Sequence, residues 1–129
     1  MKNLLSALGV VLAGLLIAAF VFLAARGLAD PATASARFGE AATDAAGQFY
    51  YRVYLSRNLV IVLAAAAFLV LRRWRPLAIL MTLVILLPLF DIFSLRANGT
   101  QPPVFHYIAL AWIVVTSVLL WIKARAEGK

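Results

Sequence analysis

Four long stretches of this sequence are almost entirely apolar and carry very few charges. They cover residues 4–25, 49–71, 77–95 and 104–122. A helix of about 20 such residues crosses the hydrocarbon core of a bilayer. Because no water can hydrogen-bond the backbone there, each stretch must satisfy its own N–H and C=O groups, as a helix does. The sequence therefore predicts an all-α fold, an integral membrane four-helix bundle in which residues 1–129 form a single domain.

The composition excludes several other classes of protein. Apolar residues make up 65% of the chain and charged residues 13%, whereas soluble domains contain roughly 45–50% and about 25%. A soluble fold of this size could not bury that much apolar surface. A soluble enzyme and a nucleic-acid-binding module are therefore poor fits, despite a net charge of +7. The chain has no cysteine and one histidine, so we expect neither a metal site nor a cofactor.

The basic residues outside the four stretches indicate the orientation. Most of them fall on one side of the membrane: Lys2, Arg72, Arg73, Arg75, Lys123, Arg125 and Lys129. The other side receives the loop acids and fewer basic residues: Arg26, Asp30, Arg37, Glu40, Asp44 and Arg96. The positive-inside rule then predicts a plasma (inner) membrane protein with both termini cytoplasmic. We interpret the Arg72–Arg75 turn, which includes Trp74, as an anchor of this topology.

The first stretch has two interpretations and a pattern of small residues. It follows Lys2 and could be a signal peptide, but it is longer than the roughly 7–15 residues of a signal-peptide core, so we expect it to be retained. Small residues recur along it at helical spacing: Ala7, Gly9, Ala13, Gly14 and Ala18. Such spacing lets helices approach closely. We expect it to serve packing within one bundle, with a homo-oligomer as the alternative.

Local signals predict one short helix and one kink. In the loop of residues 26–48, Asp30 is a suitable N-cap, Pro31 suits a first turn and Gly39 a helix end. These residues predict a short surface helix over residues 31–38, on the outer side, and a second turn is expected to begin at Thr43 or Asp44. In the third stretch Pro88 leaves the carbonyl of Val84 without its helical donor, which predicts a kink.

Three ionisable residues lie deep within the stretches: Arg57, Asp91 and His106. Arg52 is about a turn further out and can reach the head groups by extending its side chain. A deep ionisable group costs at least about 2.5–3.5 kcal/mol in hydrocarbon and usually faces the bundle interior with a partner. Counting 1.5 Å per residue from the inner boundaries places the three deep residues at about 22, 24 and 26 Å. They share a level in the outer half of the membrane, and this coincidence predicts a site there.

Residues near Arg57 extend this candidate site. Tyr50, Tyr54 and Arg57 fall on one helical stripe, with Asn58 beside it. In one interpretation Arg57 and Asp91 form a structural ion pair and the tyrosines belong to an interfacial belt. In the other, a pocket opens to the outer leaflet, where Arg57 binds an anionic or carbonyl group and Asp91 and His106 exchange protons. The predicted ligand-binding set is Tyr50, Tyr54, Arg57, Asn58, Asp91 and His106.

Several short segments also carry a family likeness: Pro31 to Gly39, Tyr51-Arg52-Val53, Arg57-Asn58-Leu59, Leu87-Pro88-Leu89-Phe90-Asp91, and His106. Together they resemble a family of small four-span membrane proteins of unknown function, placed with the DoxX-like superfamily. The resemblance implies a four-helix bundle that shares Arg57, Asp91 and His106, and it implies no substrate. The family usually has an acid where this chain has Asn58, which argues against a mechanism with two carboxylates.

Two functions remain open from the sequence. The first is a non-catalytic bundle that binds a lipid-like molecule or assists a membrane protein partner. The second is a small membrane enzyme, an isomerase or hydrolase, that acts on an apolar substrate by acid–base chemistry with Asp91 and His106 as the candidate catalytic residues. A transporter is the weakest alternative, because the first stretch contains no ionisable residue. The expected partners are the lipid bilayer and an apolar small molecule or lipid, and no nucleic acid.

Overall fold

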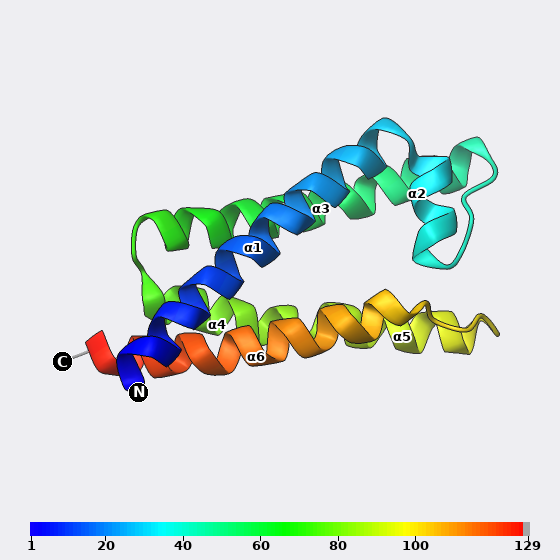
Figure 1. Cartoon of the computed structure of the whole chain (residues 1–129). Coiled ribbons are helices and arrows are strands. Elements are labelled where there is room, and N and C mark those ends of the chain that lie inside the picture. The colour runs from blue at the N-terminus through cyan, green and yellow to red at the C-terminus, as the bar shows by residue number, and fades with distance from the viewer. Residues whose placement is uncertain (128–129) are drawn as a thin grey trace.

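The computed structural model describes residues 1–127, and this part of the chain is helical throughout apart from short connections (Figure 1). The helices are α1 (Lys2–Ala29), α2 (Pro31–Phe38), α3 (Ala45–Val70), α4 (Trp74–Val84), α5 (Leu86–Ala97) and α6 (Val104–Glu127). Four segments are long and apolar enough to cross a membrane: Asn3–Ala29, Ala45–Val70, Trp74–Ala97 and Val104–Ala126. The predicted membrane four-helix bundle with one short helix is confirmed.

The helices extend beyond the apolar stretches at several ends. The second span begins at Ala45, four residues before the apolar stretch, because the Asp44 side chain accepts a hydrogen bond from the Gly47 N–H at 2.7 Å and caps the helix. The turn expected at Thr43 or Asp44 is therefore the first turn of α3. Apolar stretches mark the part of a helix that lies in hydrocarbon, whereas capping residues mark where the helix begins.

The third span is interrupted where Pro88 predicts a kink. α4 ends at Val84 and α5 begins at Leu86, with Ile85 between them. Proline has no N–H to donate to the carbonyl four residues earlier, which here is that of Val84. Ile85 keeps helical dihedral angles, with φ at −54° and ψ at −32°, so α4 and α5 together form one membrane span.

The spans form two pairs, and the start of α1 lies near the end of α6 at one end of the bundle, which we call the terminal end (Figure 1). α1 packs against α3 in the first pair and, just as extensively, against α6, while α4 and α5 pack against α6 in the second pair. Near the terminal end α1 crosses α6, where a Cβ on Gly9 would lie 2.8 Å from the Leu119 Cβ. The apolar core joins the two pairs and consists of Ala13, Leu16, Ile17, Ala65, Leu77, Ala78, Met81, Ile113, Leu120 and Ala124.

The two pairs of helices diverge at the opposite end, which we call the α2 end (Figure 1). In the described residues no Cα atom of α3 lies within 8 Å of one in α5, and none of α2 lies that close to α5 or α6. Side chains and loop contacts therefore connect the pairs here. In one such contact Glu40 accepts hydrogen bonds from the Asn98 side chain at 3.1 Å and the Thr100 hydroxyl at 2.9 Å.

The short helix α2 has the bounds and the caps that the sequence predicts. The Asp30 side chain accepts a hydrogen bond from the Thr33 N–H at 3.1 Å, and Pro31 occupies the first turn. Gly39 ends the helix with φ at 130°, a conformation that glycine adopts readily and other residues rarely do. A Cβ on Gly39 would lie 3.1 Å from the Leu95 side chain and 3.2 Å from Pro103. Glycine thus lets the end of α2 approach α5 and the start of α6.

The cap of α2 predicts a pH dependence. Hydrogen bonding by Thr33 holds the pKa of Asp30 below its usual value of 3.8, with smaller contributions from the charges of Arg26 and Arg37. A lowered pKa means that the carboxylate stabilises α2 fully above pH 3.8, and that this contribution is lost as the pH falls through the lower pKa of the folded state. A carbon NMR titration of the Asp30 carboxyl group should give a midpoint below 3.8. A midpoint at or above 3.8 would contradict this cap, and Asp30→Asn should remove the dependence.

Candidate functional site

His106 lies at the start of α6 and is buried, with 2% of its surface exposed. Its Nε2 atom lies 2.8 Å from the carbonyl oxygen of Phe38, the last residue of α2. A backbone carbonyl can only accept a hydrogen bond, so we assign the proton to Nε2. In a neutral ring Nδ1 is then the unprotonated nitrogen. The end of α2 therefore determines which nitrogen of His106 faces the interior.

The Nδ1 atom of His106 faces Asp91, which α5 contributes from the other side of the α5–α6 loop. Asp91 Oδ2 lies 3.9 Å from Nδ1 and 3.5 Å from the hydroxyl of Tyr54 on α3. The 3.9 Å contact is an electrostatic one, too long for a hydrogen bond. The side chain of Asp91 is 20% exposed, whereas that of His106 is 3% exposed. Asp91 is thus the member of the pair that a molecule from outside can reach.

Phe38 contacts the residues of this site with its ring as well as with its carbonyl. The ring meets those of His106 at 4.7 Å, Tyr54 at 5.7 Å and Tyr51 at 6.2 Å between centroids, each time edge to face. Edge-to-face contacts of this kind are the favoured geometry of aromatic pairs. We call Phe38, Tyr54, Asp91 and His106 the Asp–His cluster. It connects α2, α3, α5 and α6 where their backbones diverge.

The structure brings together three of the residues that the sequence assigns to a ligand site: Tyr54, Asp91 and His106. Asn58 is half-buried one turn further along α3, near the Tyr54 hydroxyl. The contact between Asp91 and His106 agrees with their placement at one level by helical rise. That calculation works because Arg75 and Lys123, from which the residues are counted, lie near the ends of their spans.

Arg57 and Tyr50 lie outside the cluster. Arg57 is exposed, and within the described residues its side chain makes no hydrogen bond or ion pair. The ion pair between Arg57 and Asp91, one of the two interpretations of the sequence, is not formed. Tyr50 is 69% exposed and packs on Phe49. Residues three positions apart differ by about 60° around a helix, which is enough to turn Arg57 outward while Tyr54 faces Asp91.

Phe38 is the member of the cluster that the sequence analysis does not assign to the site. Its backbone carbonyl has no signal in the sequence, because every residue has one. The available indication is weaker: a single aromatic residue ends a short helix next to a glycine. Within the described residues, no three His, Cys, Asp or Glu side chains lie close enough together to hold a metal ion. The chemistry of the cluster is therefore that of one carboxyl group, one imidazole and one phenol.

Comparisons with known proteins place the chain in a family. A family model described as a domain of unknown function, DUF4267, matches residues 17–120. No curated protein and no solved structure matches the chain. The matched range includes all four members of the Asp–His cluster, the second and third spans in full, and most of the fourth. This four-span membrane protein therefore belongs to the DUF4267 family of domains of unknown function.

Proposed function

We propose that this protein binds a lipid-like molecule at the Asp–His cluster, without transforming it. One observation carries the proposal: Asp91 is partly exposed within a membrane span, and in the described residues its Oδ1 atom accepts no hydrogen bond. A polar group in hydrocarbon that lacks a partner is costly. A ligand that donates a hydrogen bond to Oδ1 would remove that cost.

The surroundings of Asp91 define the class of ligand. Within the described residues His106 is the one basic side chain within 4 Å of the carboxyl group, and Arg57 is exposed and makes no ion pair with it. The polar end of the ligand is therefore a hydroxyl or an amine, which can donate to Asp91, and not an anion. Its apolar part would lie along α5, where Phe90 and Phe93 are 62% and 70% exposed. The divergence of α3 from α5 supports entry from the side, out of the lipid.

We also propose a membrane, an orientation and a superfamily for the protein. The Lys and Arg residues near the terminal end support a plasma (inner) membrane location with both termini cytoplasmic and the Asp–His cluster in the outer half of the membrane. Residues 1–129 would act as one unit, which we place with the DoxX-like superfamily on the short matches in the sequence. An accessory role beside a membrane protein partner, or as a homo-oligomer, is compatible with the same site.

Extraction of the purified protein tests ligand binding. Mass spectrometry of the solvent extract should find a hydroxyl- or amine-bearing lipid-like molecule, and Asp91→Asn should lower its occupancy about tenfold or more, because hydrogen bonds to charged groups contribute about 1.5–3 kcal/mol. Ser94→Ala, which alters an exposed polar residue one turn along the same helix, and Arg57→Gln should leave the occupancy unchanged. Equal losses in Asp91→Asn and Ser94→Ala, or a protein that carries no such molecule, would contradict the proposal.

A second function, a membrane enzyme such as an isomerase or hydrolase, has one specific observation in its favour. The Phe38 carbonyl holds His106 with Nδ1 toward Asp91 at 3.9 Å, so that a small approach of the two side chains would allow a proton to pass between them. Because both ring nitrogens of His106 face groups of the protein, Asp91 would be the residue that touches the substrate and His106 a positioning residue. Chemical change of the extracted molecule by the wild-type protein, absent in Asp91→Asn, would favour the enzyme over the binding protein.

A further inference from the structure

The connection from α3 to α4 at the terminal end contains an arginine in a conformation that usually belongs to glycine. Arg72 has φ at 54°, and it is the one non-glycine residue with positive φ in the described chain. Its N–H donates to the Leu69 carbonyl at 3.1 Å, and the Arg73 N–H donates to the Phe68 carbonyl at 2.8 Å. This pair of hydrogen bonds is the Schellman motif, in which the left-handed position is most often glycine. An arginine held there against that preference suggests a role for its side chain.

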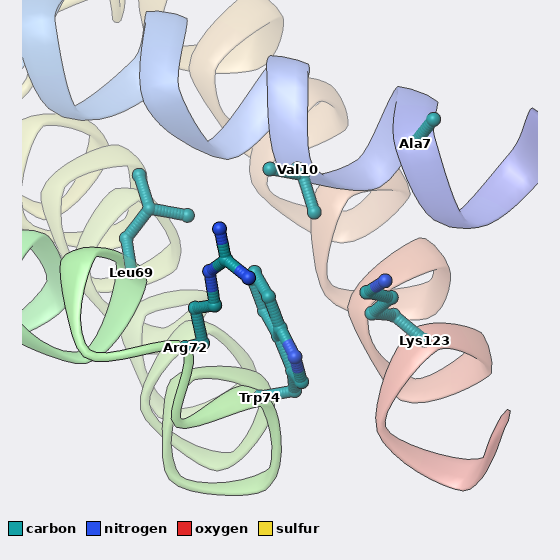
Figure 2. Close-up of a pocket in the computed structure, with 6 residues that line it drawn as sticks. All are labelled: Ala7, Val10, Leu69, Arg72, Trp74 and Lys123. Atoms are coloured by element: carbon teal, nitrogen blue, oxygen red, sulfur yellow. The ribbon is translucent and has the colours of Figure 1, made fainter. Parts of the chain in front are cut away.

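The side chain of Arg72 projects into a cavity between the helix ends. The cavity has a volume of about 450 Å³ and is lined by Ala7, Val10, Leu69, Arg72, Trp74 and Lys123. Figure 2 shows the Arg72 guanidinium between Leu69 and the ring of Trp74, with Lys123 reaching in from α6 and Val10 facing them from α1. We call this cavity the Arg72 pocket. Residues from four helices thus form its walls.

Two cations converge on the Arg72 pocket. The Lys123 nitrogen lies 5.1 Å from the centroid of the Trp74 ring, a cation–π contact that keeps the ammonium group at the pocket. The Arg72 side chain makes no hydrogen bond or ion pair within the described residues. Of the acidic residues, Asp30, Glu40 and Asp44 belong to the connection around α2 at the far end of the bundle, and Asp91 belongs to the Asp–His cluster. At the terminal end the basic residues outnumber the one remaining acid, Glu127 at the end of α6: Lys2, Arg72, Arg73, Arg75, Lys123 and Arg125. The local charge is therefore suited to an anion.

The geometry points to a binding site for the phosphate group of an anionic phospholipid. The pocket lies where the spans end, at the depth of lipid head groups, and basic pockets between span ends are typical sites for such head groups. The planar guanidinium of Arg72 matches phosphate oxygens, and Lys123 adds a second charge. Val10 and Leu69 offer an apolar wall to the glycerol backbone and the acyl chains. Inorganic phosphate carries the same charged group but would leave that wall unused.

Native mass spectrometry of the delipidated full-length protein tests this site. The wild-type protein should bind dioleoyl phosphatidylglycerol about tenfold more tightly than dioleoyl phosphatidylcholine, as expected for charge-assisted hydrogen bonds to a phosphate group that lacks a neutralising choline. Arg72→Gly should abolish this preference. Because glycine suits the left-handed position better, this variant should melt at the same temperature as the wild type or higher. Loss of binding would then not reflect misfolding.

Arg73→Gln is the matched control, since it removes the same charge from the neighbouring residue of the turn, which does not line the pocket. It should keep the preference for phosphatidylglycerol. Equal losses in Arg72→Gly and Arg73→Gln would overturn the proposal in favour of a diffuse basic surface, as would equal affinity for the two lipids. Displacement of phosphatidylglycerol by an equal concentration of inorganic phosphate would also overturn it, because the site would then recognise free phosphate and not a lipid.

Discussion

Replacing Gly9 with alanine should destabilise the bundle by about 1–3 kcal/mol, a cost typical of overpacked contacts. The added Cβ would lie 2.8 Å from the Leu119 Cβ and 3.1 Å from the Leu119 backbone carbon. A backbone atom cannot rotate away as a side-chain tip can, so α1 and α6 would have to separate. The cost should exceed the gain of up to about 1 kcal/mol that alanine brings to a helix.

Gly14→Ala is the control for this prediction, because it makes the same change five residues further along α1. A Cβ there would lie 3.9 Å from its nearest neighbour, the Leu69 side chain, which is an ordinary contact. Gly14→Ala should therefore be neutral or stabilising. The free energy of unfolding can be measured for both variants by titration with a denaturing detergent, followed by tryptophan fluorescence. Equal effects of the two substitutions would show that α1 and α6 are not in close contact at Gly9.

Replacing His106 with leucine should destabilise the α2 end by about 2–4 kcal/mol and release α2. The change leaves the Phe38 carbonyl without its donor and Asp91 without its basic neighbour. Leaving a buried polar group without a partner costs about 1–3 kcal/mol, and more when the group is charged. His106→Gln should recover part of this loss, because its amide N–H can still reach the carbonyl of Phe38, while its side chain cannot take up a proton from Asp91.

A cysteine label can report the release of α2. The chain has no cysteine, so Ser35→Cys would supply a single thiol at a position of α2 that is 1% exposed. In the wild-type background this thiol should react slowly with a membrane-impermeant maleimide. It should react much faster when His106→Leu is added, and at an intermediate rate with His106→Gln. Identical rates in the three backgrounds would mean that His106 does not hold α2 in place.

Much of the fold follows from the sequence because few backbone structures satisfy all their own hydrogen bonds in the hydrocarbon core of a membrane. Apolar length and the Lys and Arg residues locate the spans, and Asp30, Pro31 and Gly39 define α2, since each acts through local chemistry. The ends of the long helices do not follow, because a helix that leaves the hydrocarbon continues until a cap or turn ends it. Asp44 caps α3, which begins at Ala45, four residues before its apolar stretch.

The candidate site is predictable only in part, for geometric reasons. Helical rise is a fixed quantity, so depth alone brings Asp91 level with His106. Helical phase needs a known direction to the neighbouring helix, which the sequence does not provide, and Arg57 therefore turns out to be exposed. The contact of His106 with Phe38 joins residues 68 positions apart through a backbone carbonyl. Such a contact depends on how α2 folds back over the bundle, which no local pattern specifies.

The nitrogen NMR spectrum of the His106 ring, recorded with the protein in a bilayer, tests the central claim most directly. The chain contains one histidine, so uniform labelling of histidine gives signals from this ring alone. Nε2 donates to the Phe38 carbonyl and Nδ1 faces Asp91. We therefore predict a neutral ring in the Nε2–H tautomer or a ring protonated at both nitrogens. Asp91→Asn should shift the Nδ1 signal more than the Nε2 signal. Averaged signals from two exchanging tautomers, unchanged in Asp91→Asn, would contradict a His106 held between α2 and Asp91.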